Sequence, residues 1–191
     1  MQTTGEQGLG RAASNSQLER SEYGDLHFEN ISQVLARKHS KPFFLKIAPD
    51  LDDAELQDIV ETVRGAGHWL SGLIVSNTTL DRPAELSSKH AEQTGGLSGA
   101  PLFEKSTRVL QDVASELFGE FDLIGCGGIS SGADAYAKIK AGAHAVQLYS
   151  ALVYHGPSLI ARVNTELANL LQADGFKSVS EAVGADLPSR A

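Results

Sequence analysis

Hydrophobic and polar positions follow a repeating order from about Lys41 onward: a short apolar run, a turn, and then an amphipathic stretch. The apolar runs predict buried strands at residues 43–48, 72–77, 122–126 and 145–149. The amphipathic stretches place apolar residues on one helix face and predict helices that begin at Asp52, Ser106, Ser131 and Pro157. Residues 150–156 are expected to be a loop, and Ile160 is expected in the apolar stripe of the helix that follows it. Ser178 and Glu181 are expected to form a capping box for a short last helix. Uniformly apolar strands, each followed by a helix, predict a parallel sheet covered by helices.

This alternation is typical of two architectures, doubly wound sheets and (β/α)8 barrels. A complete barrel takes about 250 residues in eight units, whereas this chain of 191 residues shows four strands. We therefore predict an α/β fold with four parallel βα units, which is half of a (β/α)8 TIM barrel. Residues 1–26 show no periodicity and are expected to be a flexible lead-in, 28–38 one more helix, and 188–191 a tail.

Charge and composition exclude several classes of protein. The chain has 16 Lys and Arg against 24 Asp and Glu, a net charge of −8, which argues against nucleic-acid binding through phosphate contacts. The single cysteine, Cys126, cannot form an internal disulfide. We find no secretory signal and no apolar run of the roughly 18 residues that a bilayer requires, so we expect a soluble chain.

Polar side chains directly after the strands are the first candidates for chemistry, because parallel α/β folds place their sites there. Lys46 lies near the end of an apolar strand, where it either meets an anionic ligand or pairs with a local carboxylate. Ser76, Asn77 and Thr78 offer hydroxyl and amide groups to a planar polar ligand. The alternative for these three is an Asx or Ser/Thr turn that begins a long loop.

Glycines mark two further candidate positions. Gly99 ends the loop 94–99, and Gly128 follows the third strand, where backbone N–H groups can approach a phosphate. Tyr149 and Ser150 follow the fourth strand and complete this set. We reject Ser98 as a hydrolase nucleophile because Ala100 breaks the G-x-S-x-G pattern. The histidines show no metal-ligand spacing, so no metal site is predicted, and Cys126 is interpreted as a small buried apolar residue.

Seven segments of the chain together resemble the C-terminal half of dihydroorotate dehydrogenases of the membrane-associated, quinone-dependent class (class 2). They are LKIAPDL (45–51), GLIVSNTTLDRP (72–83), TGGLSGAPL (94–102), STRVL (106–110), LIGCGGISSGADAYAKIKAGA (123–143), VQLYSALVYHGP (146–157) and GFKSVSEAVGAD (175–186). The resemblance covers roughly residues 41–187, so residues 27–187 are expected to form a partial FMN-binding barrel domain.

The resemblance implies a cofactor, a substrate and a set of contacts. Members of this family hold flavin mononucleotide (FMN) at the C-terminal face of the barrel and oxidise dihydroorotate to orotate in pyrimidine (UMP) biosynthesis, with quinone as electron acceptor. By resemblance, Lys46 and Ser76 contact the flavin ring, and Asn77 and Thr78 contact the substrate. The contacts to the ribityl chain and phosphate fall on Gly99, Gly128, Tyr149 and Ser150.

The catalytic base of the family has no counterpart in this chain. That base is a serine in an upstream segment rich in Asn, Ser and Pro, and nothing in residues 1–40 matches it. We therefore assign no catalytic residue and expect a truncated chain that is inactive by itself. Attachment to a bacterial or mitochondrial inner membrane is implied by the family, whose membrane-docking helices are not found here. The open edges of a half-barrel also predict self-association.

Two alternatives to this function remain. One is another FMN-dependent TIM-barrel oxidoreductase, such as a flavin reductase acting on nucleobases in RNA. The net negative charge of the chain disfavours a substrate of this kind. The other is a non-enzymatic half-barrel that binds FMN or another phosphate ligand without turnover, which the missing base favours. Binding of FMN without turnover would support the second alternative.

Overall fold

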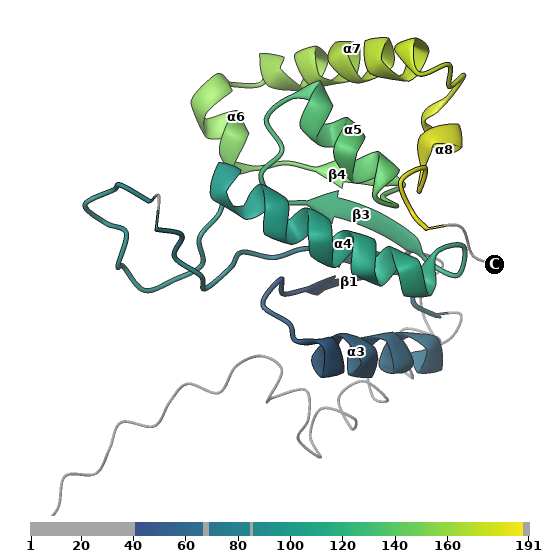
Figure 1. Cartoon of the computed structure of the whole chain (residues 1–191), viewed down its shortest axis with the longest axis horizontal. Helices are drawn as coiled ribbons and strands as arrows, with labels where there is room; N and C mark the ends of the chain where they lie inside the picture. The colour runs from purple at the N-terminus through teal and green to yellow at the C-terminus, as the bar shows by residue number, and fades with distance from the viewer. Residues whose placement is uncertain (1–40, 67–68, 85, 189–191) are drawn as a thin grey trace, which may run out of the picture. The chain divides into compact units, whose positions relative to one another are not determined.

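Four parallel strands form one sheet in the order β1-β2-β3-β4 (Figure 1). The computed structural model describes residues 41–66, 69–84 and 86–188. The strands are β1 (Phe44–Ile47), β2 (Gly72–Val75), β3 (Asp122–Cys126) and β4 (Ala145–Gln147). This confirms the predicted α/β fold with four parallel βα units. The predicted lead-in at 1–26, the predicted helix at 28–38 and most of the tail lie outside the described residues.

Helices follow the strands and contact one another in chain order. They are α3 (Asp53–Ala66), α4 (Phe103–Leu117) with the preceding 3-10 turn η2 (Ala100–Leu102), α5 (Gly132–Lys140), α6 (Ser150–His155), α7 (Ser158–Ala173) and α8 (Val179–Ala182). Helix α4 packs on α3, on α5 and on strands β2 and β3, and α7 packs on α5 (Figure 1). No helix in the described part of the chain combines the length and the apolar character needed to cross a bilayer.

The two faces of the sheet differ in burial because side chains alternate along each strand. Leu45, Leu73 and Leu123 are partners in one row across β1, β2 and β3, and this row belongs to the core beneath the helices. Each fully buried leucine contributes about 1.5–3 kcal/mol to stability. The next row holds Lys46 and Ile74, which are exposed and half-buried respectively, so it forms the opposite face.

The predicted helix starts at Asp52 and Ser131 are confirmed by their caps. Asp52 Oδ1 accepts from the Glu55 N–H at 2.8 Å, and Glu55 Oε2 accepts from the Asp52 N–H at 3.0 Å, which is a complete capping box for α3. The Ser131 hydroxyl accepts from the Asp134 N–H at 3.1 Å at the start of α5. Both pairs satisfy helix N–H groups that have no partner inside the helix.

Several predicted element boundaries are wrong. Helix α4 begins at Phe103 rather than Ser106, because the 3-10 turn η2 leads directly into it. The segment predicted as a loop from Ser150 to Gly156 is helix α6, which ends at Gly156 with φ +70°, and strand β4 therefore ends at Gln147.

Two predictions for the C-terminal helices are also wrong in detail. Ile160, predicted in the apolar stripe of α7, is 50% exposed, while Leu159, Val163 and Leu171 are buried. Ser178 caps α8 without a side-chain hydrogen bond. Glu181 instead accepts from the N–H of Lys177 at 2.7 Å.

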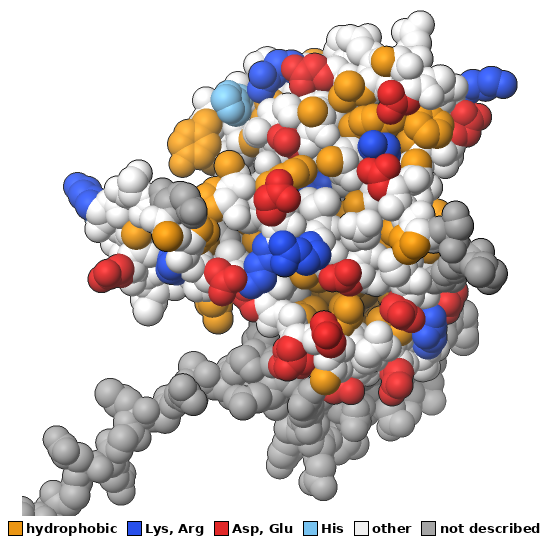
Figure 2. Space-filling view, viewed as in Figure 1, with side chains coloured by type: hydrophobic (Ala, Val, Ile, Leu, Met, Phe, Trp, Pro, Cys, Tyr) orange, Lys and Arg blue, Asp and Glu red, His pale blue; other side chains and the backbone are white. Residues whose placement is uncertain are grey.

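Large apolar side chains lie exposed around α6. Tyr149, Val153 and Tyr154 are 79%, 74% and 82% exposed, and Figure 2 shows hydrophobic side chains on the surface over this helix, at the upper left. We call these three residues the α6 patch. An exposed apolar cluster of this kind is typical of a site that contacts another protein, a membrane or a ligand.

Candidate functional site

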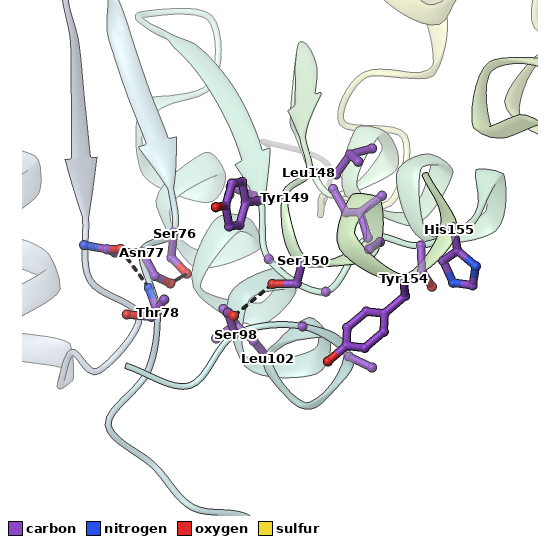
Figure 3. A pocket seen from close by; sticks show the side chains of 18 of the residues that line it. Ser76, Asn77, Thr78, Ser98, Leu102, Leu148, Tyr149, Ser150, Tyr154 and His155 are labelled. Carbon is purple, nitrogen blue, oxygen red and sulfur yellow. Dashed lines mark hydrogen bonds between the residues drawn. The ribbon is translucent and has the colours of Figure 1, made fainter. Parts of the chain in front are cut away.

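All eight candidate residues line one cavity of about 420 Å³ at the carboxyl ends of the strands. Their common position confirms that the polar and glycine-rich strand ends converge, as parallel strands require. Figure 3 shows Ser76, Asn77 and Thr78 across the pocket from Tyr154 and His155. The eight are Lys46, Ser76, Asn77, Thr78, Gly99, Gly128, Tyr149 and Ser150.

Lys46 supplies the cationic group of the cavity. It sits in β1 opposite Ile74, on the face of the sheet away from the core row, and its side chain is exposed. No carboxylate of the described residues forms an ion pair with it. A local carboxylate partner for Lys46 is therefore not observed among the described residues, and its contact with an anionic ligand stays a prediction.

The turn after β2 presents two polar side chains between two buried ones. Ser76 and Thr79 are 1% and 2% exposed, whereas Asn77 and Thr78 are exposed and line the cavity. Asn77 Oδ1 accepts from the Thr78 N–H at 2.9 Å, which is a local bond to the next residue and not the predicted Asx turn, whose N–H donor lies two residues on. The backbone N–H of Asn77 donates to Ile47 O at 2.8 Å, which ties the turn to β1. A local side-chain-to-backbone bond at Asn77 and a position in the cavity lining therefore coexist.

The backbone approaches the cavity closely at Gly128, which follows β3. Gly128 has φ +75°, and a Cβ at this position would lie 2.7 Å from the backbone nitrogen of Phe103 and 2.5 Å from its Cβ. Only glycine fits this combination of conformation and space. Gly127 and Gly128 therefore form a part of the cavity wall that carries no side chain, as phosphate-binding turns require. We call these two residues the glycine wall.

Two serines join the loop before α4 to the start of α6. Ser98 Oγ and Ser150 Oγ lie 2.8 Å apart (Figure 3). This contact brings residues that are 52 positions apart in the sequence to the same rim of the cavity. Ser98 therefore lines the cavity itself and also contacts Ser150.

A buried lysine lies behind the glycine wall. Lys138 is fully buried in α5, its Nζ donates to Ser106 Oγ at 2.6 Å, and Nζ lies 5.3 Å from the centre of the Phe103 ring. Burial lowers the pKa of Lys138 to about 7, although Cys126, Glu104 and Asp134 oppose this shift. The lysine therefore sits on the protein side of the wall that carries Gly128.

Several lining residues were missed by the analysis of the sequence. Tyr154 and His155 reach the cavity from α6, a segment predicted as a loop. The run from Ser150 to His155, free of glycine and proline, was the available signal for a helix. Cys126, predicted as buried, is half-buried in the cavity wall. The described residues contain no group of three or more His, Cys, Asp or Glu side chains placed to hold a metal ion.

Comparison with known proteins identifies the family. The family model for dihydroorotate dehydrogenase matches residues 17–171, so the match begins upstream of the segments quoted from residue 45. A dihydroorotate dehydrogenase (quinone) of Parvibaculum lavamentivorans is 56% identical over 158 residues, covering 82% of this chain and 45% of the relative. A protein of the same name from Azorhizobium caulinodans is 55% identical over 146 residues, covering 76% of this chain and 40% of the relative. The mitochondrial dihydroorotate dehydrogenase (quinone) of Arabidopsis thaliana is 54% identical, with 76% and 31% covered.

Solved structures give the same result. The crystal structure of dihydroorotate dehydrogenase from Eimeria tenella in complex with ferulenol matches with a TM-score of 0.74 and 44% identity, covering 78% of this chain and 39% of that one. Fold and site define a parallel β/α protein with its cavity at the carboxyl ends of the strands, the arrangement found in β/α barrel enzymes. The chain belongs to the dihydroorotate dehydrogenase family, and its relatives are of the quinone class. It spans roughly 40% of the length of the first bacterial relatives.

Proposed function

We propose that the cavity binds FMN and dihydroorotate and contributes the C-terminal part of the active site of a quinone-dependent dihydroorotate dehydrogenase. The observation that carries this proposal is the convergence of all eight candidate residues on one cavity. The family membership of the chain supports it, as do the names of its relatives.

The residues fit the chemistry of FMN. A dianionic phosphate needs backbone N–H groups and hydroxyls in a space without side chains, which Gly128, Gly99 and Ser150 provide. Tyr149 stands at the same rim and would contact the ribityl chain. Lys46 would face the flavin ring, where a cation stabilises the reduced, anionic form, and the buried Ser76 would contact the ring from the neighbouring strand.

Asn77 and Thr78 are suited to the substrate. Dihydroorotate presents an amide edge and a carboxylate, and the side chains of Asn77 and Thr78 offer a carboxamide and a hydroxyl on the same side of the cavity. When bound, FMN would accept a hydride from dihydroorotate; the residues of this chain hold and orient the reactants. Proton removal requires a base on the other face of the substrate, and we assign none to this chain.

The names of the relatives support proposals for the electron acceptor and for membrane association. Quinone is the proposed electron acceptor, and association with the inner membrane is proposed from the quinone class and from relatives named as mitochondrial. A non-enzymatic half-barrel and an FMN barrel with another substrate are less well supported, since the curated relatives are named dihydroorotate dehydrogenase (quinone).

Titration of FMN followed by orotate tests the proposal. We expect FMN fluorescence to be quenched on binding to the 191-residue chain, with an affinity well below that of a complete barrel, because much of the enclosing surface is not supplied by the described residues. Orotate should bind only after FMN. Reduction of a dye by dihydroorotate should stay below detection. Absence of any FMN binding contradicts the proposal, and retention of stoichiometric FMN through purification contradicts the weak affinity.

A further inference from the structure

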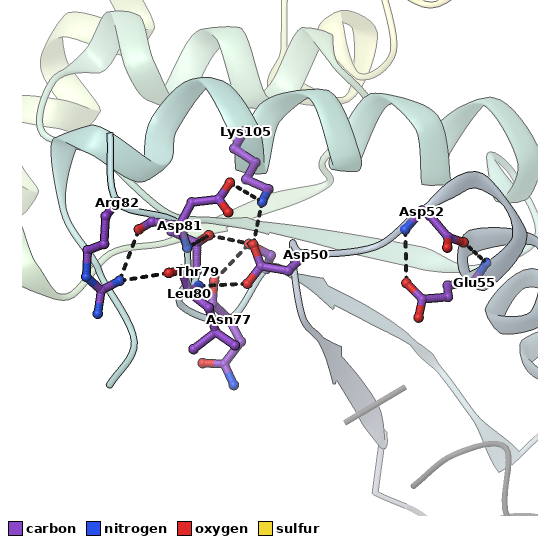
Figure 4. A network of polar contacts seen from close by, with 10 residues as sticks. Asp50, Asp52, Glu55, Asn77, Thr79, Leu80, Asp81, Arg82 and Lys105 are labelled. Atoms are coloured by element: carbon purple, nitrogen blue, oxygen red, sulfur yellow. Dashed lines mark hydrogen bonds and ion pairs between the residues drawn. The ribbon is translucent and has the colours of Figure 1, made fainter. Parts of the chain in front are cut away.

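Three segments of the chain meet at the side chain of Asp50, next to the cavity but outside its lining (Figure 4). Asp50 follows β1, Thr79 and Leu80 follow β2, and Lys105 lies in the first turns of α4. Asp50 Oδ1 accepts from Thr79 Oγ1 at 2.5 Å and from Lys105 Nζ. Asp50 Oδ2 accepts from the Leu80 N–H at 2.8 Å. We call Asp50, Thr79 and Lys105 the Asp50 junction.

Each side chain of the junction forms at least two polar contacts. The Thr79 hydroxyl donates to Asp50 and also accepts from the Asp81 N–H at 3.0 Å. Lys105 Nζ also contacts Asp81 Oδ2 at 2.6 Å. Charge-assisted bonds of this kind are stronger than neutral ones and fix geometry on both oxygens of the carboxylate. The position of Thr79 is therefore fixed by Asp50, which follows β1 and is itself held by Lys105 of α4.

The junction remains charged across the neutral pH range. Burial alone would raise the pKa of Asp50, but hydrogen bonds from Lys105, Thr79 and Leu80 outweigh it and hold the pKa below its usual value. Burial would lower the pKa of Lys105, and its bonds to Asp50 and Asp81 outweigh that effect and raise the pKa.

What the junction holds is the turn that carries the proposed substrate contacts. Asn77 and Thr78 precede Thr79 directly, and the backbone of Thr79 is bridged to Leu97 by bonds of 3.1 Å and 2.7 Å. This bridge lays Gly96 against Thr78, where a Cβ on the glycine would lie 1.8 Å from Thr78 Oγ1. A shift of Thr79 would therefore move Thr78 and the loop around Gly96 together.

We propose that Asp50 is a positioning residue for the substrate end of the cavity: through Thr79 and Lys105 it fixes Asn77 and Thr78 without touching the ligand. This inference rests on the proposed function for the identity of the ligand. The proposed phosphate contacts, Gly99, Gly128 and Ser150, do not belong to the junction. The Asp50 junction thus bears on orotate and leaves the phosphate contacts in place.

Two matched pairs of variants test this proposal in the full 191-residue chain. Asp50→Asn removes the charge and one acceptor, while Asp52→Asn makes the same change two residues away, at the α3 cap that asparagine also supports. Thr79→Val removes the hydroxyl, while Thr79→Ser keeps it. We measure orotate affinity by calorimetry with FMN present, FMN affinity by fluorescence, and hydrogen exchange of the amides from Thr79 to Asp81 and at Leu97.

Asp50→Asn and Thr79→Val should lower the affinity for orotate about tenfold, which corresponds to the loss of roughly one charge-assisted hydrogen bond. Both should speed exchange at Thr79 to Asp81 and change FMN affinity less than about threefold. Asp52→Asn and Thr79→Ser should match the unchanged chain. Unchanged orotate affinity, or equal losses of orotate and FMN, overturns the proposal.

Hydrogen exchange distinguishes a failure of the positioning role of Asp50 from a failure of the proposed function. If the unchanged chain binds no orotate, the proposed function fails, whereas the exchange rates still report whether Asp50 holds the turn. Unchanged exchange at Thr79 to Asp81 in Asp50→Asn would show that the turn is fixed without the carboxylate, and would overturn the positioning role by itself.

Discussion

Lys138 Nζ donates to Ser106 Oγ over 2.6 Å and thereby joins α5 to α4 behind the glycine wall of the cavity. Ser106 Oγ lies 3.3 Å from the carbonyl oxygen of Gly127, so the contact extends from the buried ammonium to the loop after β3. Glu104 and Asp134 are carboxylates that act on Lys138 electrostatically, and neither forms an ion pair with it among the described residues. A buried cation without a carboxylate partner makes stability depend on pH.

The stability of the chain should rise with pH above neutrality through Lys138. Its folded pKa is about 7 against an ordinary value of 10.5. Between these values the unfolded state binds more protons, so the free energy of unfolding increases with pH by up to about 1.4 kcal/mol per unit. Below the folded pKa both states are protonated, and the contribution is constant.

Lys138→Met isolates this effect. Methionine fills a similar volume, and Ser106 Oγ keeps Phe103 O at 3.1 Å as an acceptor. Denaturant unfolding at pH 6, 7.5 and 9 should show the variant at least as stable as the unchanged chain at pH 6. The difference should move in favour of the unchanged chain as the pH rises. A difference that does not vary with pH would contradict the prediction.

Gly128→Ala should damage both stability and ligand binding. The new Cβ would meet the backbone nitrogen of Phe103 at 2.7 Å in a residue with φ +75°. We expect the free energy of unfolding to fall by about 2–3 kcal/mol, and FMN affinity to fall more than about tenfold because the wall moves. Chemical denaturation and FMN fluorescence measure the two effects.

Gly119→Ala is the matched control. Gly119 also has positive φ, at +83°, but open space surrounds its Cβ position. The substitution should cost only the backbone strain of about 1 kcal/mol and leave FMN affinity unchanged. Equal losses of FMN affinity in the two variants would show that global destabilisation, and not the wall at Gly128, sets the affinity.

Lys46→Gln should lower FMN affinity while leaving the free energy of unfolding nearly unchanged. Lys46 is exposed and forms no ion pair with the described residues, so the free energy of unfolding should change by less than about 0.5 kcal/mol. FMN affinity should fall about tenfold if the ammonium faces the flavin. Lys41→Gln removes an exposed lysine outside the cavity lining and should change neither quantity. An unaltered FMN affinity in Lys46→Gln would remove this residue from the proposed site.

The strands and the candidate site could be predicted because both depend on local pattern. Apolar runs marked the four strands to within about two residues at each end, and the polar residues that follow them necessarily share one edge of a parallel sheet. The caps at Asp52 and Ser131 were readable for the same reason, since each uses a partner three residues away.

Contacts between segments far apart in the chain could not be predicted from the sequence. Lys138 falls in a polar-looking helix stretch, and its burial depends on Gly125, where the absent side chain leaves room for the lysine stem: a Cβ there would lie 3.1 Å from Lys138 Cβ. The Asp50 junction joins residues 29 and 55 positions apart. Such pairings are set by tertiary packing and carry no local periodicity.

Self-association through the α6 patch is the remaining prediction. Tyr149, Val153 and Tyr154 are each more than two-thirds exposed, and β1 and β4 are the outer strands of the described sheet. Burial of apolar area is favourable at about 25 cal/mol per Å², so contact between two patches is expected in concentrated solution. Light scattering should show a mass above that of a monomer. Val153→Ser combined with Tyr154→Ser should raise the dissociation constant about tenfold or more. Leu80→Ser, at a side chain that is 69% exposed in the long loop, should leave it unchanged. A monomeric mass at all concentrations, or equal effects of the two sets of substitutions, would show that the α6 patch does not mediate association.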